Sequence, residues 1–263
     1  MRVSALLWLG VGVSVSAAIQ EAEPGQFPYT VSLQVRLPLC LSVEVYLSCL
    51  QVSGLGGHNC AGVLLSPWWV VSTGLCAQTD EDLDHDHFQV VAGEWNLAGV
   101  DGTEQVRHVE TVFTHPYFSA EQGGDIALIK LNSSLELGQF VAPVSFAQFG
   151  SSYEGSRCVE AGWSTLSGHV KLQYGEVVLR TQEECEADPN VGPHAWATMC
   201  GGEEDTGTAV MCPGYTGSPV VCPEGEEMVL AGLQSFTYSC GTQAECSTLI
   251  GRAPSRLCSD WSD

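Results

Sequence analysis

The stretch that decides the fold is Cys212-Pro213-Gly214-Tyr215-Thr216-Gly217-Ser218-Pro219-Val220-Val221-Cys222. It starts as a loop rich in glycine and proline and continues as a short apolar strand that ends on a cysteine. Runs of the same kind recur along the chain, separated by turn residues. They are Tyr29–Val35, Val43–Leu47, Ala61–Leu65, Trp69–Ser72, Phe88–Ala92, His108–Thr114, Ile126–Leu131, Val159–Gly162, Glu176–Leu179, Val220–Cys222 and Met228–Leu233.

Most of the predicted elements are short strands. We expect one short helix, over Pro254–Trp261. Such a pattern predicts an all-β sandwich or barrel. The chain has 263 residues, of which 44% are hydrophobic and 15% charged. These values indicate a globular protein with one large domain or a double barrel. The pattern loosens over Val141–Gly150, where we expect a crossover between two halves.

The net charge is −22, from 9 basic and 31 acidic residues. This charge disfavours nucleic acids and anionic membranes as partners, because both are bound by clusters of Lys and Arg. It permits a basic protein partner, or it serves only solubility. The densest acidic run, Asp80–Asp86, is expected to be a solvated loop.

Residues 1–18 have the features of a secretory signal peptide: a positive Arg2, an apolar stretch over Ala5–Val15 and a small-residue cleavage site. The apolar stretch is short for a bilayer span, so an N-terminal anchor is the weaker reading. We therefore expect a secreted, extracellular protein whose mature chain starts near Ile19. The 12 cysteines then predict disulfides, whereas zinc would need C-x-x-C pairs close to histidines.

Six blocks, in order, resemble the chymotrypsin-like serine-protease family of trypsins, chymotrypsins and elastases. The blocks are Pro24–Gln34, Cys60–Leu64, Trp69–Cys76, Gly124–Ile129, Cys212–Cys222 and Asp260-Trp261. The middle four resemble the family's C-G-G-S-L, W-V-V-T-A-A-H-C, N-D-I-A-L-L and C-x-G-D-S-G-G-P. The resemblance covers essentially the whole mature chain. It implies a peptidase S1-like domain over 19–263 with the trypsin-like fold: two antiparallel six-stranded β-barrels, about 19–140 and 141–263, and a short C-terminal helix.

The chemistry of that family needs a hydroxyl nucleophile, an imidazole that takes its proton and a carboxylate that orients the imidazole. By the resemblance, the carboxylate is Asp125, while Leu75 stands at the imidazole position and Thr216 at the nucleophile position. Leucine cannot accept a proton, and a threonine hydroxyl needs a base before it can attack. The triad is therefore degenerate, and we expect no functional catalytic residue. The histidines of the chain, none of which occupies a family catalytic position, are His58, His85, His87, His108, His115, His169 and His194.

The activation switch of the family is missing as well. In active members a freed I-V-G-G terminus folds inward and pairs with the aspartate before the nucleophile. Here Ser16-Ala17-Ala18-Ile19 stands in the first place and Tyr215 in the second. Tyrosine carries no charge at neutral pH, so a buried ammonium would have no counter-charge. Losing both partners together is physically consistent.

The recognition pocket implied by the resemblance is also altered. Its floor is Val210, where trypsins have aspartate, so a cationic side chain would not be selected. Gly214, Ser235 and Thr237 are the other pocket positions, and Thr237 in place of glycine should narrow the entrance. The alternative is that these residues only pack.

An acidic loop over Gly93–Gln105 resembles the calcium loop of trypsins and elastases. Calcium prefers six to eight oxygens from carboxylates and carbonyls. Glu94, Asp101 and Glu104 would supply carboxylates, and Asn96 and Gly99 backbone carbonyls. The alternative is an acidic hairpin without metal.

The resemblance also implies disulfide pairs and leaves four cysteines to pair outside the family scheme. The family pairs are Cys60–Cys76, Cys158–Cys222, Cys185–Cys200 and Cys212–Cys240. The simplest guess for the rest is Cys40–Cys49 and Cys246–Cys258, although pairing across the halves or to another chain stays open. Asn132-Ser133-Ser134 is a glycosylation sequon.

These features favour a secreted, non-catalytic protease homologue that acts by binding a protein, as a cofactor or decoy in extracellular proteolysis or immunity. The first alternative is an atypical serine-type endopeptidase that uses Thr216, and the second is a structural or storage protein. The insertion over Arg36–His58 and the acidic run are the first places to look for a partner surface.

Overall fold

The computed structural model describes residues 19–35, 57–77, 88–116, 118, 124–148, 150–163, 169–187, 198–202, 216–235 and 250–251. The signal peptide expected over residues 1–18, the strand expected over Val43–Leu47 and the helix expected over Pro254–Trp261 lie outside these residues. Among the described helices, none has the length and apolar character needed to cross a membrane.

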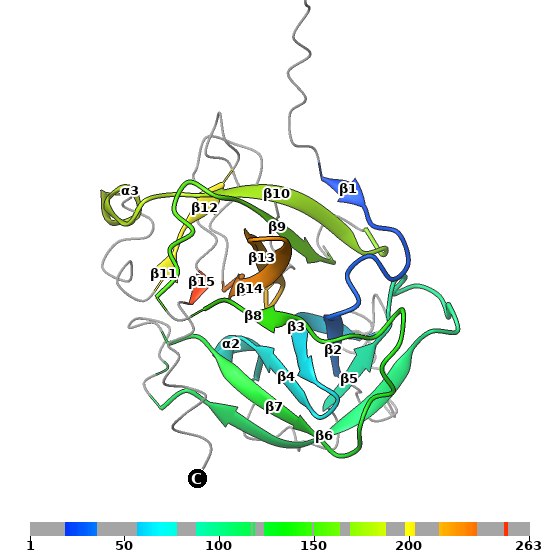
Figure 1. Cartoon of the computed structure of the whole chain (residues 1–263). Coiled ribbons are helices and arrows are strands. Elements are labelled where there is room, and N and C mark those ends of the chain that lie inside the picture. The colour runs from blue at the N-terminus through cyan, green and yellow to red at the C-terminus, as the bar shows by residue number, and fades with distance from the viewer. Residues whose placement is uncertain are drawn as a thin grey trace, which may run out of the picture.

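The first half of the chain forms a closed barrel of six strands, with antiparallel neighbours in the order β2-β3-β4-β7-β6-β5. It occupies the lower part of Figure 1. Its strands are β2 (Thr30–Val35), β3 (His58–Ser66), β4 (Trp69–Ser72), β5 (Phe88–Ala92), β6 (Gln105–Thr114) and β7 (Ala127–Leu131). Each of them contains a stretch that the sequence predicts as a strand, and the predicted all-β barrel is confirmed here.

The interior of this barrel follows from the alternation of side chains along each strand. In β7, Ala127, Ile129 and Leu131 are buried while the residues between them are partly exposed. The side chains of Ile129 and Leu131 meet those of Leu33, Leu64 and other residues in one apolar core. Burial of this apolar surface drives closure of the barrel.

The second half forms a seven-stranded sheet in the order β1-β10-β9-β13-β14-β8, with β12 also paired to β10. The strands are β1 (Gln20–Glu21), β8 (Ser145–Phe146), β9 (Arg157–Gly162), β10 (Gln173–Leu179), β12 (Gly201–Gly202), β13 (Pro219–Glu224) and β14 (Glu227–Leu233). A separate pair joins β11 (Thr198–Met199) to β15 (Ile250–Gly251). Within the described residues the second half is thus an open path rather than a ring of six, and β1, from the start of the first half, lies at its edge.

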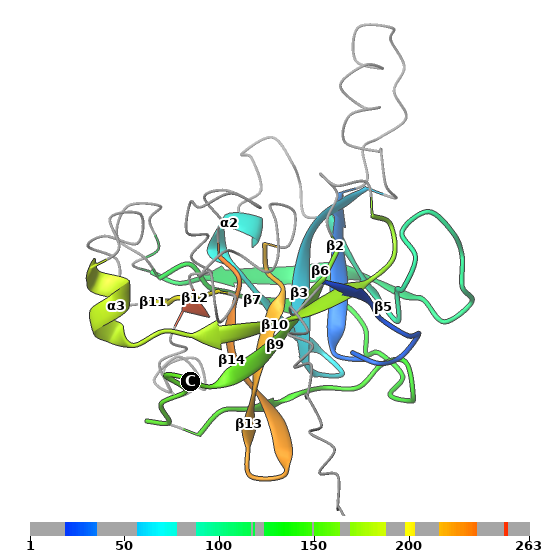
Figure 2. The same cartoon turned by 90° about the horizontal axis from the view of Figure 1, so that it is seen from above.

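Strands β13 and β14 are a hairpin, which Figure 2 shows as a long arm. Gly225, with a φ of 68°, occupies its turn, a backbone region that glycine enters without steric cost. The two helices among the described residues are short: α2 (Gly74–Ala77) follows β4, and α3 (Gln182–Ala187) follows β10.

The two halves are joined by a shared apolar cluster. Val63 and Val71 of the barrel pack with Val221, Leu230 and Leu233 of the second sheet. This packing brings α2, the start of β7 and the end of β14 together, and these three segments carry the candidate site.

Candidate functional site

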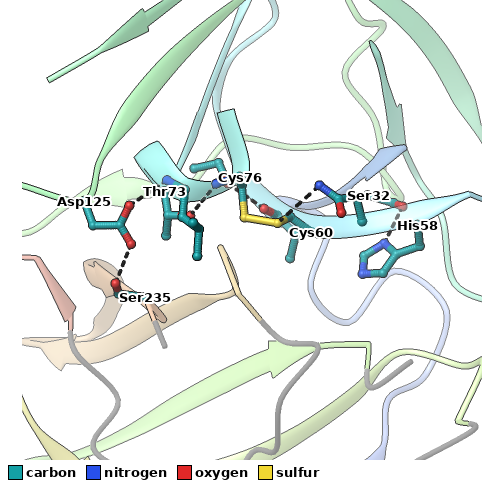
Figure 3. The surroundings of a disulfide bond; sticks show 11 residues. Ser32, His58, Cys60, Thr73, Cys76, Asp125 and Ser235 are labelled. Atoms are coloured by element: carbon teal, nitrogen blue, oxygen red, sulfur yellow. Dashed lines mark hydrogen bonds between the residues drawn. A yellow bond between two sulfur atoms is a disulfide. The ribbon is translucent and has the colours of Figure 1, made fainter. Parts of the chain in front are cut away.

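The carboxylate of Asp125 lies just before β7 and links segments from both halves (Figure 3). Its Oδ1 accepts a 2.7 Å hydrogen bond from the backbone N–H of Leu75, and its Oδ2 accepts one from the hydroxyl of Ser235. Burial raises the pKa of Asp125, and the hydrogen bonds from Ser235 and from the backbone of Leu75 and Gly74 oppose that rise. Asp125 therefore ties α2 to the end of β14.

Leu75 stands on α2, which is held in place from two sides. Thr73 Oγ1 accepts the backbone N–H of Cys76 at 3.2 Å, as an N-terminal cap does. Cys76 is bonded to Cys60 of β3. The side chain of Leu75 itself is 50% exposed. Because this side chain is aliphatic, it has no atom that could accept a proton from a nucleophile.

The loop with Thr216 is seated against β3 by its backbone. The carbonyl of Thr216 accepts the N–H of Ala61 at 2.8 Å, and Gly217 N–H donates to the Gln234 carbonyl at 2.8 Å. Gly217 has a φ of +85°, and a Cβ there would lie 2.0 Å from the Ala61 carbonyl oxygen. Only glycine fits such an approach. Within the described residues, Thr216 and Gly217 are therefore fixed against β3 and Gln234 by backbone contacts.

Within the described residues, no histidine ring is hydrogen-bonded to Asp125. Its two carboxylate oxygens accept hydrogen bonds from the backbone of Leu75 and from the hydroxyl of Ser235. The buried His58 instead shares a 2.7 Å hydrogen bond with Ser32 and lies edge-on to Trp163. His85, His87 and His194 lie outside the described residues. A hydroxyl nucleophile needs a base within hydrogen-bond reach, and the described part of the site holds none.

Of the expected pocket and activation residues, the structure describes two. Ser235 is 5% exposed and is engaged with Asp125 rather than open to a ligand. Ile19, which directly precedes β1, is 39% exposed. The remaining positions, Val210, Gly214, Tyr215 and Thr237, lie outside the described residues, so their roles stay predictions.

The acidic loop brings together the three carboxylates that the sequence predicts as metal ligands. One oxygen from each of Glu94, Asp101 and Glu104 lies within 4.8 Å of the others. Glu94 Oε1 is buried and has no hydrogen-bond partner in the part of the chain that the structure describes. The other two are oriented by backbone amides: Asp101 Oδ2 accepts Asn96 N–H at 3.0 Å, and Glu104 Oε2 accepts Gly102 N–H at 2.7 Å.

The three carboxylates of this loop lie close enough to change one another's protonation. Burial, and then the charges of Glu104 and Asp101, raise the pKa of Glu94 to about 7. Backbone hydrogen bonds lower the pKa of Glu104 despite its burial. Of the predicted carbonyl ligands, that of Asn96 already accepts Gly99 N–H at 2.9 Å.

Three predicted disulfides are confirmed: Cys60–Cys76, Cys158–Cys222 and Cys185–Cys200. Cys212–Cys240, Cys40–Cys49 and Cys246–Cys258 lie outside the described residues and stay predictions. Asn132 is exposed in the turn after β7.

Glu160 of β9 is a chemically unusual residue that no sequence motif singled out. Its side chain is 0% exposed, and both carboxylate oxygens lack a partner among the described residues. Burial raises its pKa to about 8. A signal was present: in Cys158-Val159-Glu160, alternation places Glu160 on the same face as the buried Cys158.

Comparison with known proteins identifies similarity to trypsin-like proteins. A family model described as Trypsin matches residues 17–252. The chain is 32% identical over 235 residues to human chymotrypsin-like elastase family member 3A, covering 84% of this chain and 78% of that protein. It is 36% identical over 197 residues to dog anionic trypsin, covering 72% of this chain and 74% of that protein.

A longer relative is mouse ovochymase-2, which is 30% identical over 236 residues. The match covers 84% of this chain but only 34% of ovochymase-2. The match to mouse atrial natriuretic peptide-converting enzyme covers 18% of that protein. The chain thus spans about a third or less of these two relatives.

Proposed function

We propose that this chain, which belongs to the trypsin family, is secreted and acts by binding a protein rather than by hydrolysing one. The observation that carries the proposal is the pair of bonds at Asp125. Its carboxylate accepts hydrogen bonds from the backbone N–H of Leu75 and from the hydroxyl of Ser235. Leucine has no imidazole that this carboxylate could orient.

The loss is large in kinetic terms. Removing the base of a serine-type triad costs about 10^6 in turnover in a comparable hydrolase. Thr216 then keeps its proton at neutral pH, because nothing in the described site accepts it. Asp125 retains a structural use, since it links α2 to β14 across the two halves. This use explains how the carboxylate can persist without catalysis.

The proposal predicts that replacing Thr216 with alanine leaves hydrolysis unchanged. The purified chain would be assayed against panels of peptide and ester substrates and with a fluorophosphonate probe for activated hydroxyls. We expect no labelling and the same background turnover in both proteins, because Thr216 lacks a base. The matched control is an active trypsin carried through the same purification.

Turnover that disappears in Thr216→Ala would contradict the proposal and support the alternative of an atypical hydrolase. Turnover that persists in the variant belongs to a contaminating protease.

Charge supports a basic protein as the partner. A net charge of −22 attracts a basic surface and repels an acidic one. Affinity capture from the native extracellular fluid, at low and at high salt, tests this. We expect a basic protein whose retention falls with salt, since exposed charges are screened. Deletion of Arg36–His58 or of Asp80–Asp86 without loss of capture would reject that segment as the binding surface.

We further propose that the acidic loop binds calcium. The donor set fits a hard cation, which takes oxygen ligands. Glu94, Asp101 and Glu104 would hold the ion. Glu94 Oε1, which has no hydrogen-bond partner among the described residues, would coordinate it. Carbonyls of Asn96 and Gly99 would complete the set.

Calcium is expected to raise the melting temperature, because a ligand that binds only the folded state stabilises it by about 2.7 kcal/mol at 100 times its Kd. The shift should be larger at pH 8 than at pH 6, since Glu94, with a pKa of about 7, must lose its proton to bind the ion. Thermal melts with and without millimolar calcium measure it. Glu104→Gln should remove the shift, and Glu136→Gln, which alters an exposed glutamate outside the loop, should keep it. An equal shift in both variants would contradict the site.

A further inference from the structure

The turn after β7 presents an asparagine in a fixed, exposed setting. Asn132, Ser133 and Ser134 are all exposed. The backbone N–H of Asn132 donates to the His108 carbonyl at 3.0 Å, and the Ser134 carbonyl accepts Arg107 Nε at 2.9 Å. These bonds hold the turn against β6 while its side chains stay in solvent.

The side chains meet the chemical requirement for N-glycosylation, which is an accessible Asn with a hydroxyl two residues later. Asn132 Oδ1 accepts the Ser133 hydroxyl at 3.2 Å. Within the described part of the chain, its amide nitrogen has no hydrogen-bond partner. Ser134 supplies the hydroxyl of the sequon. The other asparagines, Asn59, Asn96 and Asn190, lack a Ser or Thr two residues later.

We propose that Asn132 carries the N-linked glycan of this protein, and this inference rests on the proposed secretion. The co-reactant is a lipid-linked oligosaccharide diphosphate. A bond forms between Asn132 Nδ2 and the first sugar carbon, the bond from that carbon to the phosphate oxygen breaks, and the amide loses a proton. No oxidant or reductant is required.

The position of the turn determines which surface the glycan covers. Leu131 N–H donates to the Trp68 carbonyl at 2.9 Å, and Leu135 N–H to the Pro67 carbonyl at 2.8 Å. The turn therefore lies against the connection of β3 and β4, where the Trp68 side chain is 44% exposed. A glycan there stands beside this apolar surface.

The same placement leaves the candidate site uncovered. Asp125 precedes the first residue of β7 and Asn132 follows the last, Leu131. A strand of this length separates its ends by about 13 Å. The glycan is thus expected to be attached at the opposite end of β7 from Asp125.

The test expresses the full chain in a eukaryotic secretory cell, collects it from the medium and measures intact mass before and after peptide N-glycosidase. We expect a mass loss and conversion of Asn132 to aspartate. Asn132→Gln and Ser134→Ala should abolish the loss. Ser133→Ala, the matched control, should keep it, because Asn-Ala-Ser is still a sequon.

A secreted chain without a glycan would overturn this proposal and leave the secretion standing. A chain retained in the cytosol would overturn both. Mass loss that persists in Asn132→Gln would also contradict the proposal, since it would place the glycan elsewhere. Partner capture by Asn132→Gln is expected to equal that of the unmodified sequence, which separates the glycan from the proposed binding function.

Discussion

Replacing Glu160 with glutamine is expected to raise the free energy of unfolding by about 3 kcal/mol at pH 7 and by only about 1 kcal/mol at pH 5. The carboxyl is 0% exposed and has no hydrogen-bond partner in the described structure. Folding must therefore either bury a charge or retain a proton. Glutamine is nearly isosteric and carries no charge at any pH, so it removes this cost.

The pH dependence of this stabilisation follows from the pKa of Glu160. Burial raises this pKa to about 8, above its value of about 4.3 in an unfolded chain. Below the unfolded pKa both states hold the proton, and the folded state suffers no penalty. As the pH rises toward 8 the unfolded chain ionises first, so stability falls by about 1.4 kcal/mol per pH unit. Above the folded pKa the loss levels off.

Denaturant unfolding of both proteins between pH 5 and pH 8 measures the effect as a difference, so the other titrating groups cancel. Glu227, exposed at the start of β14, offers a matched control. We expect Glu227→Gln to change stability by less than about 0.5 kcal/mol at every pH. Parallel pH curves for the starting protein and Glu160→Gln would show that the carboxyl is not buried as described.

Removing the Cys158–Cys222 disulfide by alanine substitution at both positions is expected to cost about 4 kcal/mol of stability. The two cysteines are 64 residues apart, and a crosslink restricts the unfolded chain more when the loop it closes is longer. They also join β9 to β13 within the core of the second half, where both are 0% exposed. The measurement is denaturant unfolding under non-reducing conditions.

The Cys185–Cys200 pair is the matched control, because it is similarly buried but only 15 residues apart. Its double alanine variant is expected to lose about 3 kcal/mol, less than the longer loop. A loss that is larger for Cys185–Cys200 than for Cys158–Cys222 would contradict the loop-length explanation.

Much of the candidate site could be predicted from the sequence because its residues stand in blocks that resemble those of the family. Leu75 and Thr216 are identified by their neighbours in the chain, and the carboxylates of the acidic loop lie within a short segment, Glu94–Glu104. Local spacing therefore determines that they can meet, and the structure brings the three carboxylates together. The partners of Asp125 could not be read in this way, since Leu75 is 50 residues away and Ser235 is 110.

The sequence by itself predicted the longer strands and the all-β class, and through the family resemblance it predicts that base and nucleophile are replaced, because alternation and residue identity are local properties. The two-residue strands β1, β8, β11, β12 and β15 were not predicted. Only the tertiary structure decided that β2 pairs with β5 to close the barrel and that β1 joins the second sheet. It also decided that Glu160 is buried without a hydrogen-bond partner among the described residues. These outcomes depend on which distant strands share a core, and that choice is made by the burial of apolar surface over the whole chain rather than by any one segment.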